Sequence, residues 1–232
     1  MINEQPLVSV GIPTYNRPEG LRRTLECITK QTYKNLEIIV SDNCSPGGDT
    51  EAVVREFMVN DSRIQYFRQK ENIGSFYNFQ FVHEKAQGEY FAWAADDDDR
   101  TPEYLETCLQ GFQKSEKLVL VNTFSELVDP QSEEVIKVDR GCTTIGMPAC
   151  IRYKRYLSSI FKEQAGVGDL IYGVIKCSAL NRVTPLPNIL SEDHILLARL
   201  ALEGEFYTIP QALMRSRPGG LSSKGYKSLA KA

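Results

Sequence analysis

Four consecutive aspartates, Asp96 to Asp99, directly follow the apolar run EYFAWAA at residues 89–95. Like charges this close raise one another's pKa, so the run is costly unless water or a cation screens it. Carboxylate oxygens suit Mg²⁺ and Mn²⁺, which proteins often hold through one or two carboxylates together with phosphate oxygens. The run therefore indicates either a solvated acidic turn or a site for a metal–diphosphate complex.

Polar residues also follow two other apolar runs. Pro13-Thr14-Tyr15-Asn16 comes after the run at 7–12, and Asp42-Asn43 ends the run at 36–42. The Asp42 carboxylate could accept a hydrogen bond from the imide N–H of a pyrimidine base. An Asx-turn that ends a strand explains the same aspartate, and the residues alone leave both readings open.

A second acidic pair, Glu192-Asp193, opens a stretch with helical character at 191–206. Ser191 is a suitable N-cap, and acids in a first turn interact favourably with the helix dipole. This structural explanation is complete and is the one that the residues alone favour. A carboxylate at this position could also act as a general base on an acceptor hydroxyl.

The elements that must position these groups alternate along the first half of the chain. Apolar runs predict strands at 7–12, 36–42, 64–67, 89–95 and 118–122, with the first ended by Pro13. Helical spacing predicts helices at 18–30, 49–58, 75–86 and after Pro102. This alternation indicates an α/β fold whose parallel sheet is covered on both faces. Since ligands bind at the carboxyl ends of such strands, the three polar groups should share one edge.

The second half of the chain is less regular and is expected to complete the same domain. The DPQSEE stretch predicts a hairpin over 124–140, and the helix at 191–206 should end at Gly204 as a C-cap. FYTIP and ALMRSR, at 206–210 and 212–217, are expected to form two short strands.

Composition excludes several classes of protein. The 232 residues carry a formal net charge of −3 and lack the basic patch that nucleic-acid binding requires. No apolar run is long enough to span a membrane, and the N-terminus lacks the pattern of a signal peptide. Six cysteines stand singly and only two histidines are present, which makes a zinc site improbable and predicts reduced thiols in a cytosolic protein.

Three blocks together resemble glycosyltransferase family 2, whose members have the GT-A fold. They are residues 8–49, opening with VSVGIPTYNRP; residues 71–106, with the aspartate run as a D-x-D-type metal motif; and residues 190–210, where Glu-Asp opens a helix. Their order and spacing carry the resemblance. It implies a Rossmann-like, mostly parallel sheet flanked by helices, with residues 1–122 as the nucleotide-sugar-binding half and 123–232 as the acceptor-binding half of one domain.

The resemblance also implies roles for individual residues. Asp98 is the implied metal ligand, although four aspartates leave the register of the motif open by one. Asp193 is the implied catalytic base, with Glu192 beside it. The implied nucleotide-binding residues are Pro13, Thr14, Tyr15, Arg17, Asp42, Asn72, Gly74, Asp96 and Asp97.

The implied reaction is a single inverting displacement. An acceptor hydroxyl loses its proton to Asp193 and attacks the anomeric carbon, and the metal-bound diphosphate leaves. The implied cofactor is Mn²⁺ or Mg²⁺, and the implied partners are a nucleotide-sugar donor, in the first instance UDP-linked, and a glycan or lipid-linked acceptor. The resemblance further implies a role in the synthesis of cell-surface polysaccharide or glycolipid. Such a role predicts a cytoplasmic protein in peripheral contact with the inner face of the membrane.

One position departs from the family pattern. Many relatives carry a late R-x-H element whose histidine helps to bind metal or diphosphate, and here Arg217 stands in that place. A guanidinium cannot ligate a metal, but it can hold a diphosphate through two parallel hydrogen bonds.

Three other classes of protein are alternatives to the transferase. Residues 97–101 match the D-x-D-x-T motif of haloacid-dehalogenase-like phosphatases, but Gly173 stands where their later acidic pair needs an aspartate. A nucleotidyltransferase would need a glycine-rich basic triphosphate loop, which the chain lacks. The third alternative is a non-catalytic module that binds nucleotide sugars or glycans.

Overall fold

Strands and helices alternate through the first half of the chain, as the hydrophobic pattern predicts. A computed structural model describes residues 5–96, 98–160, 168–189 and 191–217. The first elements are β1 (Val8–Thr14), α1 (Pro18–Thr29), β2 (Leu36–Asp42), α2 (Asp49–Met58), β3 (Ile64–Arg68), α3 (Ser75–Glu84) and β4 (Tyr90–Trp93). Each lies within two residues of its predicted bounds.

The second half contains elements that the pattern did not predict. It comprises β5 (Asp99–Arg100), α4 (Tyr104–Gly111), η1 (Phe112–Lys114), β6 (Leu118–Val128), β7 (Val135–Asp139), α5 (Ala149–Ile160), η2 (Gly168–Tyr172), β8 (Val174–Lys176), α6 (Cys177–Val183), α7 (Glu192–Glu203) and β9 (Glu205–Ser216). The hairpin of β6 with β7 and the end of α7 before Gly204 confirm the expectations. Strands β5 and β8 are too short to show a period, and α5 and α6 were not predicted.

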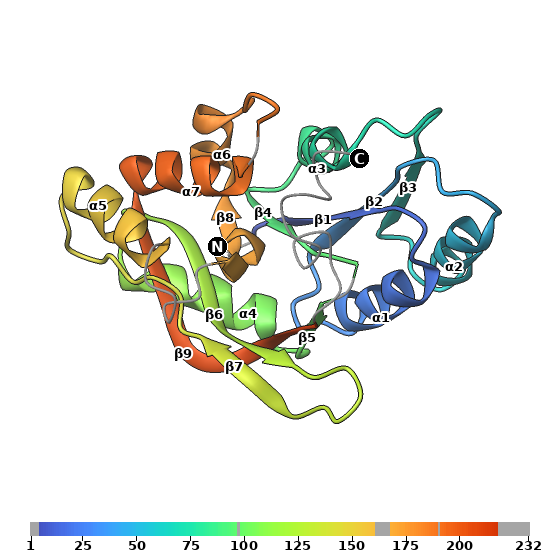
Figure 1. The fold of residues 1–232 in the computed structure, drawn as a ribbon, viewed down its shortest axis with the longest axis horizontal. Helices are drawn as coiled ribbons and strands as arrows, with labels where there is room; N and C mark the ends of the chain where they lie inside the picture. Colours follow the sequence, from blue (N-terminus) through green and yellow to red (C-terminus); the bar gives the residue numbers. More distant parts are fainter. Residues whose placement is uncertain (1–4, 97, 161–167, 190, 218–232) are drawn as a thin grey trace.

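One sheet joins the two halves in the order β3-β2-β1-β4-β8-β6-β9-β5, with β7 paired to β6 (Figure 1). Pairs among β1 to β4 are parallel, with Val8 opposite Leu36 and Tyr90. The later strands form a mixed sheet, since β8 is antiparallel to β4 and β6 while β9 is parallel to β6. The parallel part of the sheet is the first half, where strands and helices alternate, and the expected mixed region follows it. The boundary after residue 122 falls inside β6.

Helices cover both faces of this sheet, which is the expected α/β architecture. One hydrophobic cluster packs α1, α2 and α4 against one face, and a second packs α3, α5, α6 and α7 against the other. Gly11 in β1 allows α3 a close approach, because a Cβ there would lie 2.7 Å from the Val82 side chain. The Trp93 side chain is buried in the second cluster, as expected for a core residue.

Pro13 does not end β1, contrary to the prediction. The strand continues to Thr14, and Pro13 is paired with Ser41 of β2. The Gly11 carbonyl accepts a hydrogen bond from Ala94 and the Thr14 carbonyl one from Asn43. Alternate residues of a parallel strand bond to opposite neighbours, so Pro13 faces the β4 side, beyond the last β1–β4 pair. The N–H that proline lacks is not needed there.

The two short strands predicted at the end of the chain are one long strand, β9. Its pairing with β6 shifts register between Ile209 and Ala212, so Pro210 lies in an irregularity of the ladder. A bulge tolerates a proline that would otherwise interrupt the ladder. The sequence marks Pro210 as a break, whereas the sheet accommodates it as a bulge.

Within the described residues, no helix has both the length and the apolar character needed to cross a membrane. The six cysteines are free thiols, in agreement with the sequence expectation.

The base of the β6–β7 hairpin holds a partly buried carboxyl, that of Asp139, which should make the free energy of unfolding depend on pH. Burial raises the pKa of Asp139 to about 6, and nearby Asp169 adds to the shift. The folded chain thus holds this proton more tightly than the unfolded chain. This bound proton contributes its full stabilising free energy below the ordinary pKa near 3.8. The contribution is lost as pH rises through about 6.

Between pH 4.5 and 7.5, the free energy of unfolding should therefore decrease less in Asp139→Asn than in the wild type. At pH 7.5 the variant should be more stable than the wild type by roughly 1–3 kcal/mol. Urea unfolding at the two pH values measures this, with the exposed Glu116→Gln as the control. Equal pH slopes for wild type and Asp139→Asn would contradict the prediction.

Candidate active site

The turn after β1 is tied directly to the acidic run after β4. The Thr14 hydroxyl donates to Asp96 Oδ2 at 2.8 Å, and Arg17 Nη1 donates to Asp96 Oδ1 at 3.0 Å. Asp96 is only 8% exposed, so this charge is desolvated and compensated by the arginine. Two of the three predicted strand-end groups therefore meet at one edge. Pro13 lies on the same strand end, and the Tyr15 side chain is 45% exposed beside it.

In the third group, at the end of β2, both carboxylate oxygens of Asp42 accept a hydrogen bond from within the protein. Asp42 Oδ1 accepts from the Ser45 amide at 2.8 Å, and Oδ2 accepts from the Tyr66 hydroxyl at 2.8 Å. Burial raises the pKa of Tyr66, and its hydrogen bond to the Asp42 carboxylate raises it further. Asp42 thus makes the local turn contact that the sequence left open. The imide N–H of a pyrimidine base would have to donate its hydrogen bond to a remaining lone pair of this buried carboxylate.

Asn43 connects the end of β2 to the loop before α3. Its Nδ2 donates to Asn72 Oδ1 at 2.9 Å, and its Oδ1 accepts from the Ile73 amide at 2.8 Å. The Gly74 amide donates to the same Asn72 oxygen at 2.9 Å, and Gly74 has φ +85°, a conformation that favours glycine. The implied nucleotide-binding residues Asn72 and Gly74 therefore lie next to the β2 end.

Helix α1 forms the platform under the acidic run. Gly20 packs directly on the backbone there, because a Cβ at this position would lie 2.1 Å from the Asp96 carbonyl oxygen. The Thr24 hydroxyl donates to the Ala95 carbonyl at 2.9 Å and is 3.4 Å from the Asp98 carbonyl. Sequence reasoning missed both residues. The glycine inside a predicted helix was the available signal, since it costs about 1 kcal/mol relative to alanine and often marks a close contact.

Asp98 lies on the same supported turn and is 4% exposed. Asp97 falls outside the described residues. The described residues contain no group of three or more His, Cys, Asp or Glu side chains arranged to hold a metal ion. The carboxylates of the acidic run still suit Mg²⁺ or Mn²⁺. These ions need one or two protein carboxylates and take their other ligands from phosphate and water.

Arg217, expected near a diphosphate, is bound to two carboxylates. Its Nη1 donates to Asp99 Oδ2, and its Nη2 lies 3.1 Å from both Glu133 oxygens on the β6–β7 hairpin. Arg215 is instead an exposed residue of β9 paired with Glu126. Arg217 thus links the end of β9 to the acidic run. A diphosphate would have to replace one of these carboxylates as its partner.

The Glu192-Asp193 pair occupies the first turn of α7, as predicted. Ser191 stands at the N-cap position, but its side chain makes no capping hydrogen bond and its φ is +64°. Burial raises the pKa of Glu192, and the neighbouring Asp193 carboxylate adds to this. The capping explanation favoured by the residues alone therefore lacks its hydrogen bond.

Tyr156 of α5 is a further residue at this end of α7, and sequence reasoning missed it because α5 was not predicted. Its hydroxyl lies 2.9 Å from His194 Nδ1. Burial raises the pKa of Tyr156, and the charge of Asp193, the residue before His194, raises it further. Helix α7 contacts η2, which in turn lies against β4, the strand that leads into the acidic run.

Comparison with known proteins gives consistent matches. The model of glycosyl transferase family 2 matches residues 9–183. The GalNAc(5)-diNAcBac-PP-undecaprenol beta-1,3-glucosyltransferase of Campylobacter jejuni is 38% identical over 106 residues, covering 45% of this chain and 34% of that protein. The putative teichuronic acid biosynthesis glycosyltransferase TuaG of Bacillus subtilis is 33% identical over 110 residues, covering 47% of this chain and 43% of that protein. The matches thus cover less than half of each of these relatives.

Solved structures agree in fold at low sequence identity. S. aureus TarS 1-349 in complex with UDP has a TM-score of 0.68 and 17% identity, covering 90% of this chain and 60% of that chain. The mannosyltransferase PcManGT of Pyrobaculum calidifontis, in complex with GDP-Man and Mn²⁺, has the same TM-score and identity, covering 98% of this chain and 60% of that chain. These likenesses confirm the expected GT-A fold. Because the family match spans well over half of its residues, this chain belongs to glycosyl transferase family 2.

Proposed function

We propose that this chain is an inverting glycosyltransferase that moves a sugar from a nucleoside-diphosphate donor to an acceptor hydroxyl. The observation that carries the proposal is the convergence of strand ends, where Thr14 and Arg17 bind Asp96 while Asn43 binds Asn72. Such an edge of an α/β sheet is where ligands bind. The proposed donor is a UDP-sugar, with support from a structural relative that binds UDP and UDP-GlcNAc.

The proposed acceptor belongs to cell-surface polysaccharide or glycolipid synthesis. Relatives named for an undecaprenol-linked acceptor and for teichuronic and colanic acid synthesis support this class. Synthesis on a lipid-linked acceptor would place the enzyme in the cytoplasm, in peripheral contact with the inner face of the membrane.

The proposed nucleotide contacts are the residues gathered at the strand ends. The Tyr15 side chain is exposed and can contact a ligand. Asp42 is buried, so only the edge of its carboxylate could accept a hydrogen bond from a ligand. The full proposed set is Pro13, Thr14, Tyr15, Arg17, Asp42, Asn72, Gly74, Asp96 and Asp97. Arg217 is proposed as a diphosphate contact that must first leave Asp99 or Glu133.

Asp193 is the proposed base, which takes the proton from the acceptor hydroxyl while Glu192 supports it. The proposed metal site is Asp98, whose carboxylate could hold Mn²⁺ or Mg²⁺. A cation there would neutralise charge on the departing diphosphate. The protein residues bind and orient the two substrates, which supplies much of the rate in a displacement of this kind.

Calorimetric titration with UDP tests the proposal. UDP should bind at least about tenfold more tightly with Mn²⁺ than with EDTA, since the cation supplies charge that the backbone does not. Asp98→Ala should remove this difference, whereas Asp99→Ala, from the same run, should retain it. Loss of metal dependence in Asp99→Ala alone would show that the Asp98 assignment is wrong.

Two outcomes would contradict the proposed activity. Failure of UDP and of other nucleoside diphosphates to bind in either condition would leave the run as an acidic turn. Tight donor binding without turnover, in the presence of a lipid extract as the source of acceptor, would favour the non-catalytic binding module.

A further inference from the structure

The first turn of α7, which carries the proposed base, is weakly secured at its start. Ser191 at the N-cap position makes no capping hydrogen bond, and its φ of +64° is costly for a residue other than glycine. The amides of His194 and Ile195 share the Ser191 carbonyl, at 3.1 and 3.3 Å. Residues 192–195 are only partly buried, whereas Leu196 lies in the core. A contact from another element is therefore needed to fix this turn.

A hydrogen bond from α5 supplies such a contact. The Tyr156 hydroxyl oxygen lies 2.9 Å from Nδ1 of His194, the residue that follows Asp193. Burial raises the pKa of Tyr156, so the phenol keeps its proton and acts as the donor. A neutral His194 ring then accepts the hydrogen bond through Nδ1 and carries its own proton on Nε2.

Tyr156 is itself held firmly in place. Its side chain is fully buried, and its ring packs edge-on against Phe206 of β9 with the ring centroids 6.3 Å apart. Helix α5 is also bound to the other end of α7, because Arg152 donates to the carbonyls of Ala201 and Leu202 at 2.8 and 2.9 Å. The inner side of α5 therefore contacts α7 near both of its ends.

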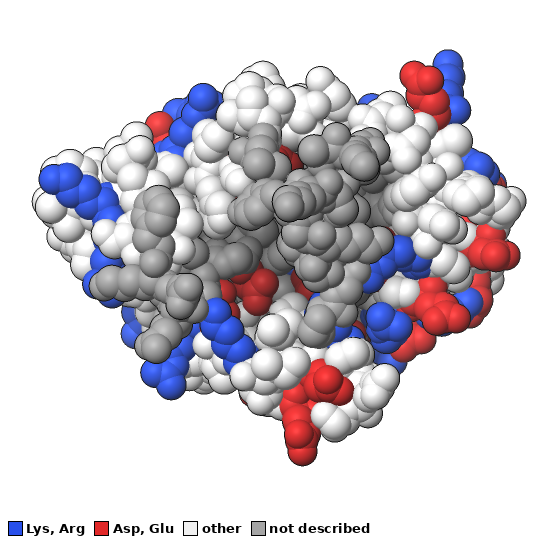
Figure 2. Space-filling view, viewed as in Figure 1, with Lys and Arg blue, Asp and Glu red and all other residues white. Residues whose placement is uncertain are grey.

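The other side of α5 faces solvent. Figure 2 shows basic side chains along the left margin, where Figure 1 places this helix. Tyr153, three residues before Tyr156, is 36% exposed. The helix thus carries a buried tyrosine that bonds to α7 and an exposed one, which together form a matched pair for substitution.

We propose that Tyr156 and His194 are positioning residues that hold the first turn of α7, and with it the Asp193 carboxylate, in place for proton transfer from the acceptor hydroxyl. This inference rests on the proposed function, which assigns Asp193 as the base. Asp193 and His194 are consecutive in one helical turn, so a tie that fixes the imidazole also fixes the backbone that carries the carboxylate. Neither positioning side chain needs to touch the substrate.

Two measurements without substrate test the hydrogen bond. Nitrogen-15 NMR should show the His194 ring as the Nε2–H tautomer with a hydrogen-bonded Nδ1, and Tyr156→Phe should remove that Nδ1 signature; the chain has only two histidines to distinguish. Amide hydrogen exchange in the first turn of α7 should be about fivefold faster in Tyr156→Phe, the factor that one net hydrogen bond contributes. Tyr153→Phe is the matched control and should behave as wild type in both.

Transfer kinetics test the effect on the base. Tyr156→Phe should lower kcat about tenfold, because misplacing a reacting group by a fraction of an ångström is costly. The KM for the donor and the affinity for UDP should stay unchanged, since the proposed nucleotide contacts lie at the strand ends. His194→Leu should cause the same loss, and the double variant no further loss, because either change removes the same bond. His194→Asn should retain most of the rate, since its Oδ1 can accept from Tyr156 in place of Nδ1.

Three kinetic results would overturn the inference. A kcat in Tyr156→Phe equal to that in Tyr153→Phe would show that the bond serves the fold alone. A loss in His194→Asn as large as in His194→Leu would show that the imidazole acts by itself, and additive losses would show that the two residues act separately. If the wild type transfers no sugar, the proposed activity fails, and the exchange measurement decides the pair: unchanged first-turn amides in Tyr156→Phe would overturn it, whereas faster exchange would support it.

Discussion

Asp193→Asn is expected to lower the transfer rate by about 10²- to 10⁴-fold, the range that positioned general bases contribute. An amide keeps the shape of the carboxylate but cannot take the proton from the acceptor hydroxyl. The proposed base lies in the first turn of α7, next in sequence to His194, whose ring lies 2.9 Å from the Tyr156 hydroxyl. Release of nucleoside diphosphate from the donor, with a lipid extract as the source of acceptor, measures the rate.

UDP affinity should change little in Asp193→Asn, because the proposed nucleotide contacts lie at the strand ends. This separates a lost base from a damaged fold. Glu192→Gln is the matched control, since it removes the adjacent carboxylate and should reduce the rate far less. A rate in Asp193→Asn equal to that of wild type, or equal losses in the two variants, would contradict the assignment.

Gly20→Ala should destabilise the protein by about 2 kcal/mol and also reduce UDP binding in the presence of Mn²⁺. The added methyl group would lie 2.1 Å from the Asp96 carbonyl oxygen, a contact that the backbone can relieve only by moving. Overpacking costs up to about 3 kcal/mol, and the better helix propensity of alanine returns about 1 kcal/mol. Moving Asp96 would also disturb its bonds to Thr14 and Arg17.

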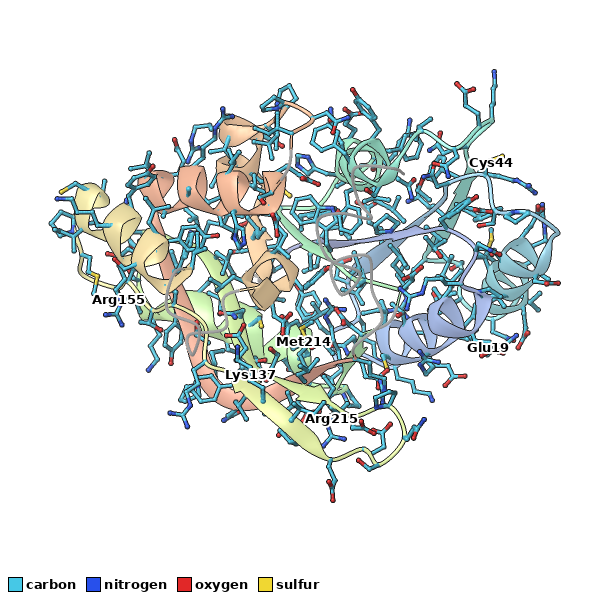
Figure 3. The ribbon with its side chains drawn as sticks, in the orientation of Figure 1. Glu19, Cys44, Lys137, Arg155, Met214 and Arg215 are labelled. Atoms are coloured by element: carbon cyan, nitrogen blue, oxygen red, sulfur yellow. The ribbon has the colours of Figure 1, made fainter. Side chains whose placement is uncertain are left out.

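Urea unfolding measures the stability, and titration with UDP measures the site. Glu19→Ala is the control, because Glu19 is the exposed neighbour on the same helix turn (Figure 3). It should leave both quantities close to those of wild type. If Gly20→Ala were as stable as Glu19→Ala and bound UDP equally well, α1 would not be the platform of the acidic run.

Helix α1 links folding and function in this chain. It supports the acidic run through Gly20 and Thr24, and the residue before it, Arg17, compensates the Asp96 charge. A change on α1 should therefore affect the site even where the changed side chain could touch no substrate. The role is one of positioning, and it depends on packing between segments more than seventy residues apart.

The alternation of strands and helices in the first half, and the polar residues at the strand ends, can be predicted from the chain without coordinates. Continuous apolar runs specify β1, β2 and β4, which are buried on both faces, and helical spacing specifies α1, because such burial is encoded within each segment. Parallel pairing then brings Thr14, Asp42 and Asp96 to one edge, as the alternation predicts.

The hydrogen-bond partners of those residues follow from the folded arrangement and not from local sequence. Asp42 is occupied by Tyr66, and Arg217 by Asp99 and Glu133, which are partners that no local pattern marks. Strands β5 and β8 exist because neighbouring strands supply their hydrogen bonds. The sheet also accepts Pro13 and Pro210 where local rules predict breaks. In each case the deciding contact joins residues far apart in the chain, so its free energy is absent from any short stretch of sequence.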